Sequence, residues 1–277
     1  MTQDQSGAVG RASWTVVMPV KSLSLSKTRL DPDRVGAGES RALAFFLDTA
    51  SAALCTDAVA RVVVASADPV IAAAAGALGC DVVDDDGHPG INAAAAWAAT
   101  VLGVSADTAV IVSDLPCLTP SALTAVLRAV PETGASFVPD ASGTGTTMWI
   151  AAGSVPIDCE FGPDSAAAHR AAGAVDLADE TGPHAPIASA RRDVDTDADF
   201  AAALALGVGP HTRALLEAEP GGLLLTVART RGRSVSVVEE SGRFHWLPAR
   251  GLASAGFRDV RPGQRVVLWP AGGITLP

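Results

Sequence analysis

Lysine is the scarcest charged residue of this chain. Only Lys21 and Lys27 are present, and the other eighteen of the 20 basic residues are arginines. Two lysines six positions apart in so arginine-rich a chain favour a use as compact ammonium charges, which suit phosphate oxygens where a planar guanidinium does not fit. The alternative is a pair of solvated surface lysines.

Long hydrophobic runs are absent as well. No apolar run reaches the ~18 residues of a membrane span, and residues 1–13 (MTQDQSGAVGRAS) lack the apolar core of a secretory signal. These residues are expected to be a disordered lead. The four cysteines are far apart without a CxxC pair, and the five histidines show no ligand spacing. A cytoplasmic protein with buried thiols is therefore expected, rather than one with disulfides or zinc.

The charge of the chain is unevenly distributed. The net charge is −10, but residues 222–277 carry eight arginines against three acidic residues, a balance of +5, so residues 1–221 carry −15. An acidic body does not suggest a nucleic-acid partner. A nucleoside triphosphate could bind such a body only where local cations and metal ions receive it.

Glycine-rich phosphate loops are also missing, since neither GxGxxG nor GxxxxGK[ST] occurs. Instead, the buried strand predicted at 14–20 runs into a polar, basic loop that contains Lys21, Lys27 and Arg29. A strand that ends in such a loop is typical of the ligand edge of an open α/β sheet. We expect this loop to bind a nucleotide through side-chain charge as well as backbone amides.

The pattern over residues 14–210 predicts an α/β fold with a doubly wound, mainly parallel sheet. Strands are expected at 14–20, 59–66, 81–84, 108–113 and 135–139, with helices between them at 39–55, 68–78, 93–102 and 119–130. A strand at 188–194 and a helix at 196–206 would close this domain. Residues 211–221 are predicted to be a linker. Residues 222–277 are predicted to be a small all-β domain, an OB-like or SH3-like barrel.

Carboxylates occur where metal ligands are expected. Asp114 directly follows the strand at 108–113, and the next helix already has Thr119 as its cap, so Asp114 is spare for Mg²⁺. Asp193 and Asp195 alternate along the predicted strand and would face one metal. Which of these two is the ligand stays open, with a solvated acidic turn as the alternative.

Three further segments suit anionic ligands. The loop Gly143–Thr147 combines glycine freedom with hydroxyls, and Gly162–Ser165 leads into a helix whose first amides would point at an anion, with the Ser165 hydroxyl beside them. Gly90 and Asn92 lie at another helix start, where the Asn92 amide would cap the helix or read a base or ribose.

Together these groups predict metal-dependent phosphoryl or nucleotidyl transfer. No Ser-His-Asp set is apparent that would supply a general base. An acceptor that is itself a phosphate needs none, because its second pKa near ~6 makes it a dianion at neutral pH.

Five segments resemble, in this order, the phosphoenolpyruvate/2-phospho-L-lactate guanylyltransferases of coenzyme F(420) biosynthesis. They are VVMPVKSLSLSKTRL, VIVSDLPCLTP, FVPDASGTGTTM, FGPDSAAAHRAAGA and DVDTDADFAAALALGVGPHTRALL. Five ordered motifs are far more specific than any one of them. The resemblance implies a GT-A-like nucleotidyltransferase fold and a reaction of GTP with phosphoenolpyruvate, or with 2-phospho-L-lactate, that releases pyrophosphate.

The resemblance also implies roles by motif position. Thr147, Gly162 and Ser165 would hold the phosphoenolpyruvate. Asp114 and Asp195 would hold the Mg²⁺ ions.

The same resemblance implies nucleotide contacts. Lys21 and Lys27 would hold the triphosphate, and the segment from Gly90 to Asn92 would lie beside the nucleotide.

Other functions remain open at this point. One is a nucleotidyltransferase for another acceptor, such as molybdopterin or a sugar phosphate. Another is a non-catalytic nucleotide- or RNA-binding protein, because Phe244 and Trp246 share one strand face of the C-terminal segment and can stack on bases. Aromatic residues at this spacing are more often core, so nucleic acid is not the expected partner. A homodimer or a downstream transferase is compatible with the sequence, and a membrane is not.

Overall fold

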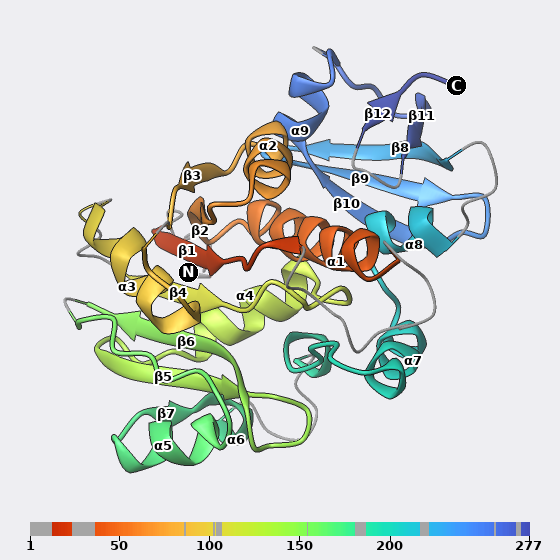
Figure 1. Ribbon diagram of the computed structural model, residues 1–277. Helices are drawn as coiled ribbons and strands as arrows, with labels where there is room; N and C mark the ends of the chain where they lie inside the picture. Colours follow the sequence, from red (N-terminus) through yellow and green to blue (C-terminus); the bar gives the residue numbers. More distant parts are fainter. Residues whose placement is uncertain are drawn as a thin grey trace, which may run out of the picture.

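The computed structural model describes residues 13–23, 37–85, 87–101, 103, 107–153, 155–180, 187–216, 222–257, 259–269 and 273–277. These residues form two β-sheets, which we name sheet A and sheet B, with helices packed around and between them (Figure 1). The arrangement confirms the predicted fold class, an α/β fold with a mainly parallel sheet followed by a smaller antiparallel β-sheet.

Sheet A contains β1 (Trp14–Pro19), β2 (Val59–Ala65), β3 (Asp81–Val83), β4 (Thr108–Ile111), β5 (Gly134–Pro139), β6 (Thr146–Ala152) and β7 (Val175–Asp176), in the order β3-β2-β1-β4-β6-β5-β7. Strand β1 pairs in parallel with β2 and β4, whereas β6 runs antiparallel between β4 and β5. The carboxyl ends of β1 and β4 therefore lie beside the amino end of β6, at one edge of the sheet.

Helices cover both faces of sheet A because its strands are buried on both sides. Val16 and Met18 of β1 face a core with helices α1 (Ala37–Leu54), α2 (Pro69–Leu78) and α4 (Pro120–Ala129), while Val17 faces α3 (Ile91–Val101). This alternation along one strand follows from its two-residue side-chain period.

Local sequence signals set several helix ends as predicted. Asp68 caps α2 by accepting from the amides of Val70 and Ile71, and Gly79 ends this helix in the left-handed conformation. Thr119 caps α4. Thr196 and Asp199 form a reciprocal capping box at α7 (Asp197–Leu206).

The prediction of a strand at 188–194 is wrong. Residues 188–190 form a short 3-10 helix, η2 (Ala188–Ala190), and residues 191–194 are irregular. This segment does not pair with sheet A, and the amide of Val194 instead bonds to the carbonyl oxygen of Asp114 at 3.2 Å.

Sheet B is antiparallel throughout and contains β8 (Leu223–Arg231), β9 (Ser234–Glu239), β10 (Phe244–Pro248), β11 (Arg265–Leu268) and β12 (Ile274–Thr275), in the order β10-β9-β8-β11-β12. Within the described residues no pairing joins β10 to β12, so the sheet is open, and the expected closed barrel is borne out only in part. A short helix, α9 (Ala249–Ser254), follows β10 and packs against α2, although an all-β segment was expected.

The segment expected as a linker is partly helical. Helix α8 (Pro210–Leu216) packs against α1, and Ala214 enters the core of sheet B. Its start is fixed by Asp48 of α1, whose carboxylate accepts hydrogen bonds from the amides of His211 (2.8 Å) and Thr212 (2.9 Å). An N-cap supplied by another helix leaves no local sequence signal, which explains why this helix was not predicted.

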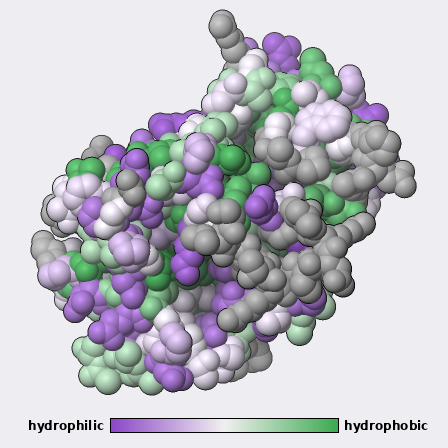
Figure 2. All heavy atoms as spheres, viewed as in Figure 1, coloured by the Kyte–Doolittle hydropathy of each residue, from purple (hydrophilic) through white to green (hydrophobic). Residues whose placement is uncertain are grey.

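The smaller elements α5 (Ser165–Ala171) and α6 (Leu177–Glu180) lie beside β7 at the far edge of sheet A (Figure 1). On the face shown in Figure 2, hydrophilic and hydrophobic residues are interspersed over the coloured part of the surface. Among the helices that the structure describes, none has the length and apolar character needed to cross a membrane.

All four cysteines lie in described parts of the chain and are buried, free thiols, as predicted. Burial raises the pKa of each to about 12.

Candidate active site

A cleft of about 970 Å³ opens at the edge of sheet A where β1 and β4 end. Residues from all the predicted anion and metal segments meet in it, although they are up to 176 positions apart in sequence. The lining groups used below are Lys21, Asn92, Asp114, Asp140, Thr146, Gly162, Asp193 and Asp195.

The loop after β1 brings Lys21 to this cleft with an exposed side chain. Asp68, the cap of α2, also holds this loop, because its Oδ2 accepts from the Leu23 amide (2.9 Å) and the Ser22 hydroxyl (3.0 Å). Lys27 and Arg29 lie outside the described residues.

Three aspartates expected at a metal lie in the cleft. Asp114 follows β4, and Asp193 and Asp195 lie on the irregular segment before α7. Asp193 and Asp195 were expected on one face of a strand, but that strand is not formed and does not bring them to Asp114. Instead, the bond from the Val194 amide to the Asp114 carbonyl joins the two backbones.

The charges of these carboxylates act on one another. Burial, followed by the charges of Asp114, Asp195 and Asp140, raises the pKa of Asp193 to about 7. A cation would relieve this repulsion, so the donor set fits a hard metal ion by charge and by its oxygen ligands. The sequence reasoning did not identify Asp140 as a member of this group.

The carboxylates nevertheless do not form a closed cage. Among the described residues, no group of three or more His, Cys, Asp and Glu side chains is placed to enclose a metal. A site for Mg²⁺ does not need three protein carboxylates, because Mg²⁺ usually takes one or two and completes its shell with water and substrate phosphates.

The loop from Asp140 to Gly145 is organised around the Asp140 side chain. Its carboxylate accepts from the Thr144 amide (3.0 Å) and the Ser142 hydroxyl (2.9 Å). Gly145 leaves room for this carboxylate, because a Cβ at this position would lie 2.8 Å from Asp140 Oδ2. Arg191 fixes the loop from behind by donating to the carbonyl oxygen of Asp140 at 2.7 Å.

Thr147, predicted to bind an acceptor, does not reach the cleft. Its side chain is fully buried, and its hydroxyl donates to the carbonyl oxygen of Ala190 at 2.7 Å. The preceding residue, Thr146, lines the cleft instead. The pairing of β6 with β5 is irregular here, because Pro139 lies opposite Thr146 whereas Val138 lies opposite Met148.

The Thr146 hydroxyl accepts two hydrogen bonds. The Ser165 hydroxyl donates to it at 3.0 Å. His169 Nε2 accepts from the Glu160 amide at 3.0 Å, so its Nδ1 carries the proton and donates to Thr146 Oγ1, also at 3.0 Å. Burial lowers the pKa of His169 and keeps the ring neutral. With two bonds accepted, the Thr146 O–H is left to donate to a ligand.

The start of α5 differs from the predicted anion cradle. The amides of Ser165, Ala166 and Ala167 already donate to the carbonyl oxygens of Gly162, Thr144 and Asp164, respectively. Ser165 is buried and acts on the cleft through Thr146. Gly162 does line the cleft, with a φ of +149°.

Asn92 and Gly90 also line the cleft, at the start of α3. Both ends of the Asn92 amide are used by one residue: its Nδ2 donates to the Phe161 carbonyl (3.1 Å) and its Oδ1 accepts from the Phe161 amide (2.8 Å). Asn92 thus holds the loop that carries Gly162, rather than presenting a free amide to a base.

Known proteins resemble this chain over the region that builds the cleft. The family described as guanylyl transferase CofC like matches residues 14–218. A phosphoenolpyruvate guanylyltransferase of Streptomyces avermitilis is 45% identical over 206 residues, covering 73% of this chain and 93% of that protein. One of Thermomonospora curvata is 42% identical over 211 residues, covering 75% of this chain and 90% of that protein.

A solved structure shows the same fold at much lower identity. A nucleotidyl transferase from Methanothermobacter thermautotroptrophicus is 12% identical, covers 69% of this chain and 95% of that chain, and superposes with a TM-score of 0.50. The family match ends at residue 218, and sheet B begins after it, at Leu223.

Proposed function

The chain belongs to the guanylyl transferase CofC-like family, and from this membership we propose that it is a phosphoenolpyruvate guanylyltransferase. The family match over residues 14–218 carries the proposal, because it includes every residue that lines the cleft. The proposal includes a place in coenzyme F(420) biosynthesis, the pathway that the sequence motifs implied.

In the proposed reaction a phosphate oxygen of phosphoenolpyruvate attacks the α-phosphorus of GTP. A new phosphorus–oxygen bond forms, the bond from the α-phosphorus to the bridging oxygen breaks, and pyrophosphate leaves with both electrons of that bond. The acceptor is a dianion near neutral pH, with a second pKa of ~6, so no side chain has to remove a proton. Catalysis then depends on positioning and charge.

Lys21 has the charge and exposure to receive the triphosphate. It lines the cleft directly after β1, where its ammonium group would stabilise the charge that develops on the leaving pyrophosphate. Lys27 and Arg29 follow in sequence, outside the described residues, and are proposed to bind the nucleotide with it.

Thr146 is the residue best prepared to orient the acceptor. Ser165 and His169 both donate to its oxygen, so its own hydrogen is directed to whatever anion occupies the cleft. Gly162 keeps the neighbouring loop free of a side chain, and Asn92 fixes that loop through Phe161.

Mg²⁺ is the proposed cofactor, held by Asp114 and Asp195 with Asp193 beside them. When bound, it would neutralise phosphate charge and align the triphosphate. The protein's own contribution is to hold these carboxylates at one edge of the cleft through the bond between Val194 and Asp114.

The test is pyrophosphate release by the purified full-length protein with Mg²⁺. GTP, ATP and CTP are each combined with phosphoenolpyruvate, 2-phospho-L-lactate and 3-phosphoglycerate. The proposal expects release only with GTP and phosphoenolpyruvate together. Release with 2-phospho-L-lactate alone would reassign the acceptor, and a need for ATP or CTP would reassign the nucleotide. The absence of pyrophosphate release in every combination, with folded protein, would contradict the proposed activity.

A further inference from the structure

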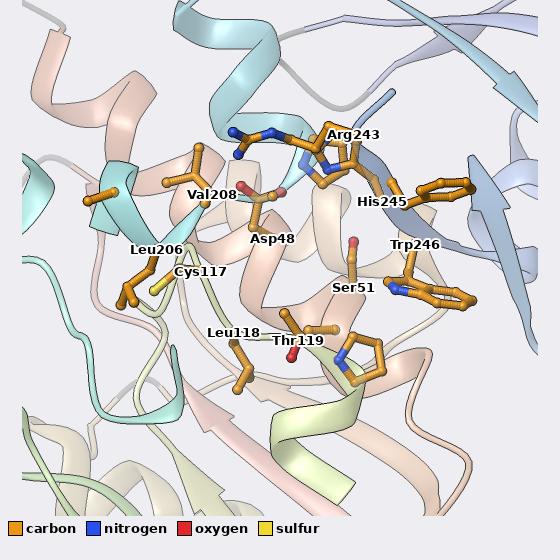
Figure 3. Close-up of a pocket in the computed structure, with 17 residues that line it drawn as sticks. Asp48, Ser51, Cys117, Leu118, Thr119, Leu206, Val208, Arg243, His245 and Trp246 are labelled. Atoms are coloured by element: carbon orange, nitrogen blue, oxygen red, sulfur yellow. The ribbon is translucent and has the colours of Figure 1, made fainter. Parts of the chain in front are cut away.

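The proposed reaction requires selection of a guanine base, and the Asn92 amide, expected to read it, is occupied by the Phe161 backbone. A second cavity, of about 350 Å³ between α1 and the edge strand β10, shares no lining residue with the cleft (Figure 3). Its carboxylate, Asp48, lies beside Arg243 and already accepts two amides of α8. The base of a nucleotide bound in the cleft therefore has to be recognised within the cleft.

Of the described carboxylates that line the cleft, Asp85 alone follows a strand on the β3 side of β1. It lies two residues after β3, and Lys21 lies two residues after β1. The pairings of β2 align the ends of these strands, because Ala65 lies opposite both Pro19 and Val83. Asp85 and Lys21 therefore extend from one level of the same sheet edge, two strand spacings or roughly 10 Å apart.

The order of the strands sets the direction in which a nucleotide would lie. Strand β4, which Asp114 follows, is on the other side of β1, so Lys21 is placed between Asp114 and Asp85. A nucleotide with its triphosphate at Lys21 and the metal aspartates can extend along this edge towards Asp85. Pro89 and Ile91, four and six residues after Asp85, also line the cleft and offer apolar surface to the faces of a purine ring.

The turn after β2 ties Asp85 to the loop that carries Lys21. The Ala67 amide donates to the Asp85 carboxylate. The carboxylate of the next residue, Asp68, accepts from the Leu23 amide at 2.9 Å. One short turn thus fixes both sides of this part of the cleft.

Helix α3 braces the loop that carries Asp85. The Trp97 indole N–H donates to the Asp84 carbonyl oxygen at 3.0 Å, and its ring stacks on His88 with the centroids 4.2 Å apart. The His88 amide in turn donates to the Asp85 carbonyl oxygen at 2.9 Å. Asp85 is therefore held in place before a ligand arrives, which lowers the entropic cost of recognition.

We propose that Asp85 selects guanine, with its carboxylate accepting hydrogen bonds from the N1–H and the N2 amino group of the base. This inference rests on the proposed function, which places the nucleotide in the cleft. An ionised carboxylate only accepts, and its two oxygens have about four lone-pair sites, so the bond from Ala67 leaves capacity for both donors. Adenine presents a ring-nitrogen acceptor in place of N1–H, which would face the carboxylate unpaired.

The test measures Kd values for the triphosphates of guanosine, inosine, xanthosine and adenosine by isothermal titration calorimetry. It uses full-length protein with Mg²⁺ and no acceptor at pH ~8, because burial raises the pKa of Asp85 and the carboxylate has to be ionised. The wild type should bind GTP most tightly. Inosine triphosphate lacks the N2 amino group and should bind about tenfold more weakly, the equivalent of one hydrogen bond to a charged group.

Asp85→Asn should exchange the preferred base. Its amide presents one acceptor and one donor, which match the N1–H and the C2 carbonyl oxygen of xanthine. We expect GTP to bind at least about tenfold more weakly and xanthosine triphosphate to become the tightest ligand. A gain of affinity for one nucleotide cannot come from misfolding. Asp84→Asn, at the exposed neighbour outside the cleft, is the matched control and should keep the wild-type order.

Two results would overturn the assignment of Asp85 alone. One is an unchanged preference for GTP in Asp85→Asn. The other is an equal loss of affinity for all four nucleotides, which would place Asp85 on the ribose that they share. Failure of the wild type to bind any of the four would overturn the proposed function together with this inference, so the two failures are distinguishable.

Discussion

The amide of Val194 donates a hydrogen bond to the carbonyl oxygen of Asp114 across 3.2 Å, and this bond joins the two segments that carry the cleft carboxylates. Asp193 and Asp195 flank Val194, so a single backbone contact sets their distance from Asp114. The pKa of Asp193, raised to about 7 by burial and then by Asp114, Asp195 and Asp140, reports the same proximity.

Replacing Asp114 with Asn should therefore lower kcat/KM by about 100-fold or more, because one of the charges that organise the metal and phosphates is lost. The backbone bond to Val194 remains, so the melting temperature should change little. Steady-state kinetics and thermal unfolding test this directly. Asp158→Asn, which removes an exposed carboxylate outside the cleft, is the matched control. Full activity in Asp114→Asn would remove this residue from the metal site.

Stability should depend on pH through Asp48 and Asp193. Burial raises the pKa of each to about 7, against ~3.9 in an unfolded chain. The folded state holds these protons more tightly, so their contribution is fully present below pH ~4 and is lost as pH rises through ~7. Each full shift corresponds to about 4 kcal/mol as an order of magnitude.

Urea unfolding of the wild type without Mg²⁺ at pH 5, 6 and 7.5 measures this slope. Asp48→Asn should flatten it, and should also lower stability at pH 5, because one amide of α8 loses its acceptor. Added Mg²⁺ should recover part of the loss at pH 7.5 by neutralising the cluster around Asp193. A slope unchanged by Asp48→Asn would contradict the assignment.

Gly209 should tolerate no side chain. A Cβ there would lie 2.4 Å from Cγ of Asp48, whose carboxylate caps α8. We expect Gly209→Ala to cost about 1–3 kcal/mol of unfolding free energy, as for other overpacked sites. Gly76→Ala is the control: its Cβ meets nothing within 4 Å, and it should stabilise α2 by about 0.5–1 kcal/mol. Equal effects of the two changes in urea unfolding would show that the contact is not tight.

Truncation tests where the nucleotidyltransferase part ends, which we propose to be near residues 211–221. Every residue lining the cleft lies between 19 and 195, so a chain of residues 1–221 should retain most of its turnover at low temperature. It should melt earlier, because β10 and α9 no longer cover α1 and α2. Loss of turnover by folded 1–221 protein would make sheet B part of the catalytic unit.

Sequence reasoning succeeded where the determinants are local. Caps such as Asp68 and Thr119 bond to amides two or three residues away, and buried strands show their character in a few consecutive residues. The positions of Lys21 and Asp114 in the cleft followed from one topological fact, that parallel strands present their carboxyl ends at the same edge.

It failed where the determinants are distant. The helix start at residue 210 depends on Asp48, more than 160 positions earlier. The amides at the start of α5 look free in sequence, yet Ala166 donates to Thr144. In the sequence, the Asn92 amide could either cap a helix or bind a base. In the structure, the Phe161 backbone occupies both ends of this amide.

Thr146 and Thr147 show the same limit and give the sharpest test of it. The two residues are identical in chemistry and adjacent in sequence, so only the local backbone of β6, which is irregular opposite Val138 and Pro139, assigns one to the cleft and the other to the core. Thr146→Val removes the O–H that points at the ligand and should raise the KM for phosphoenolpyruvate by about tenfold, the equivalent of one hydrogen bond to a charged group. Its melting temperature should also fall, because the buried donors of Ser165 and His169 lose their acceptor.

Thr147→Val should lower stability without raising the KM. The carbonyl oxygen of Ala190 loses its 2.7 Å bond in a fully buried place, at a cost of about 1–3 kcal/mol in stability, while KM stays near the wild-type value. Kinetics with phosphoenolpyruvate and urea unfolding of both variants separate the two roles. A raised KM in Thr147→Val with normal stability would contradict this assignment of the two threonines.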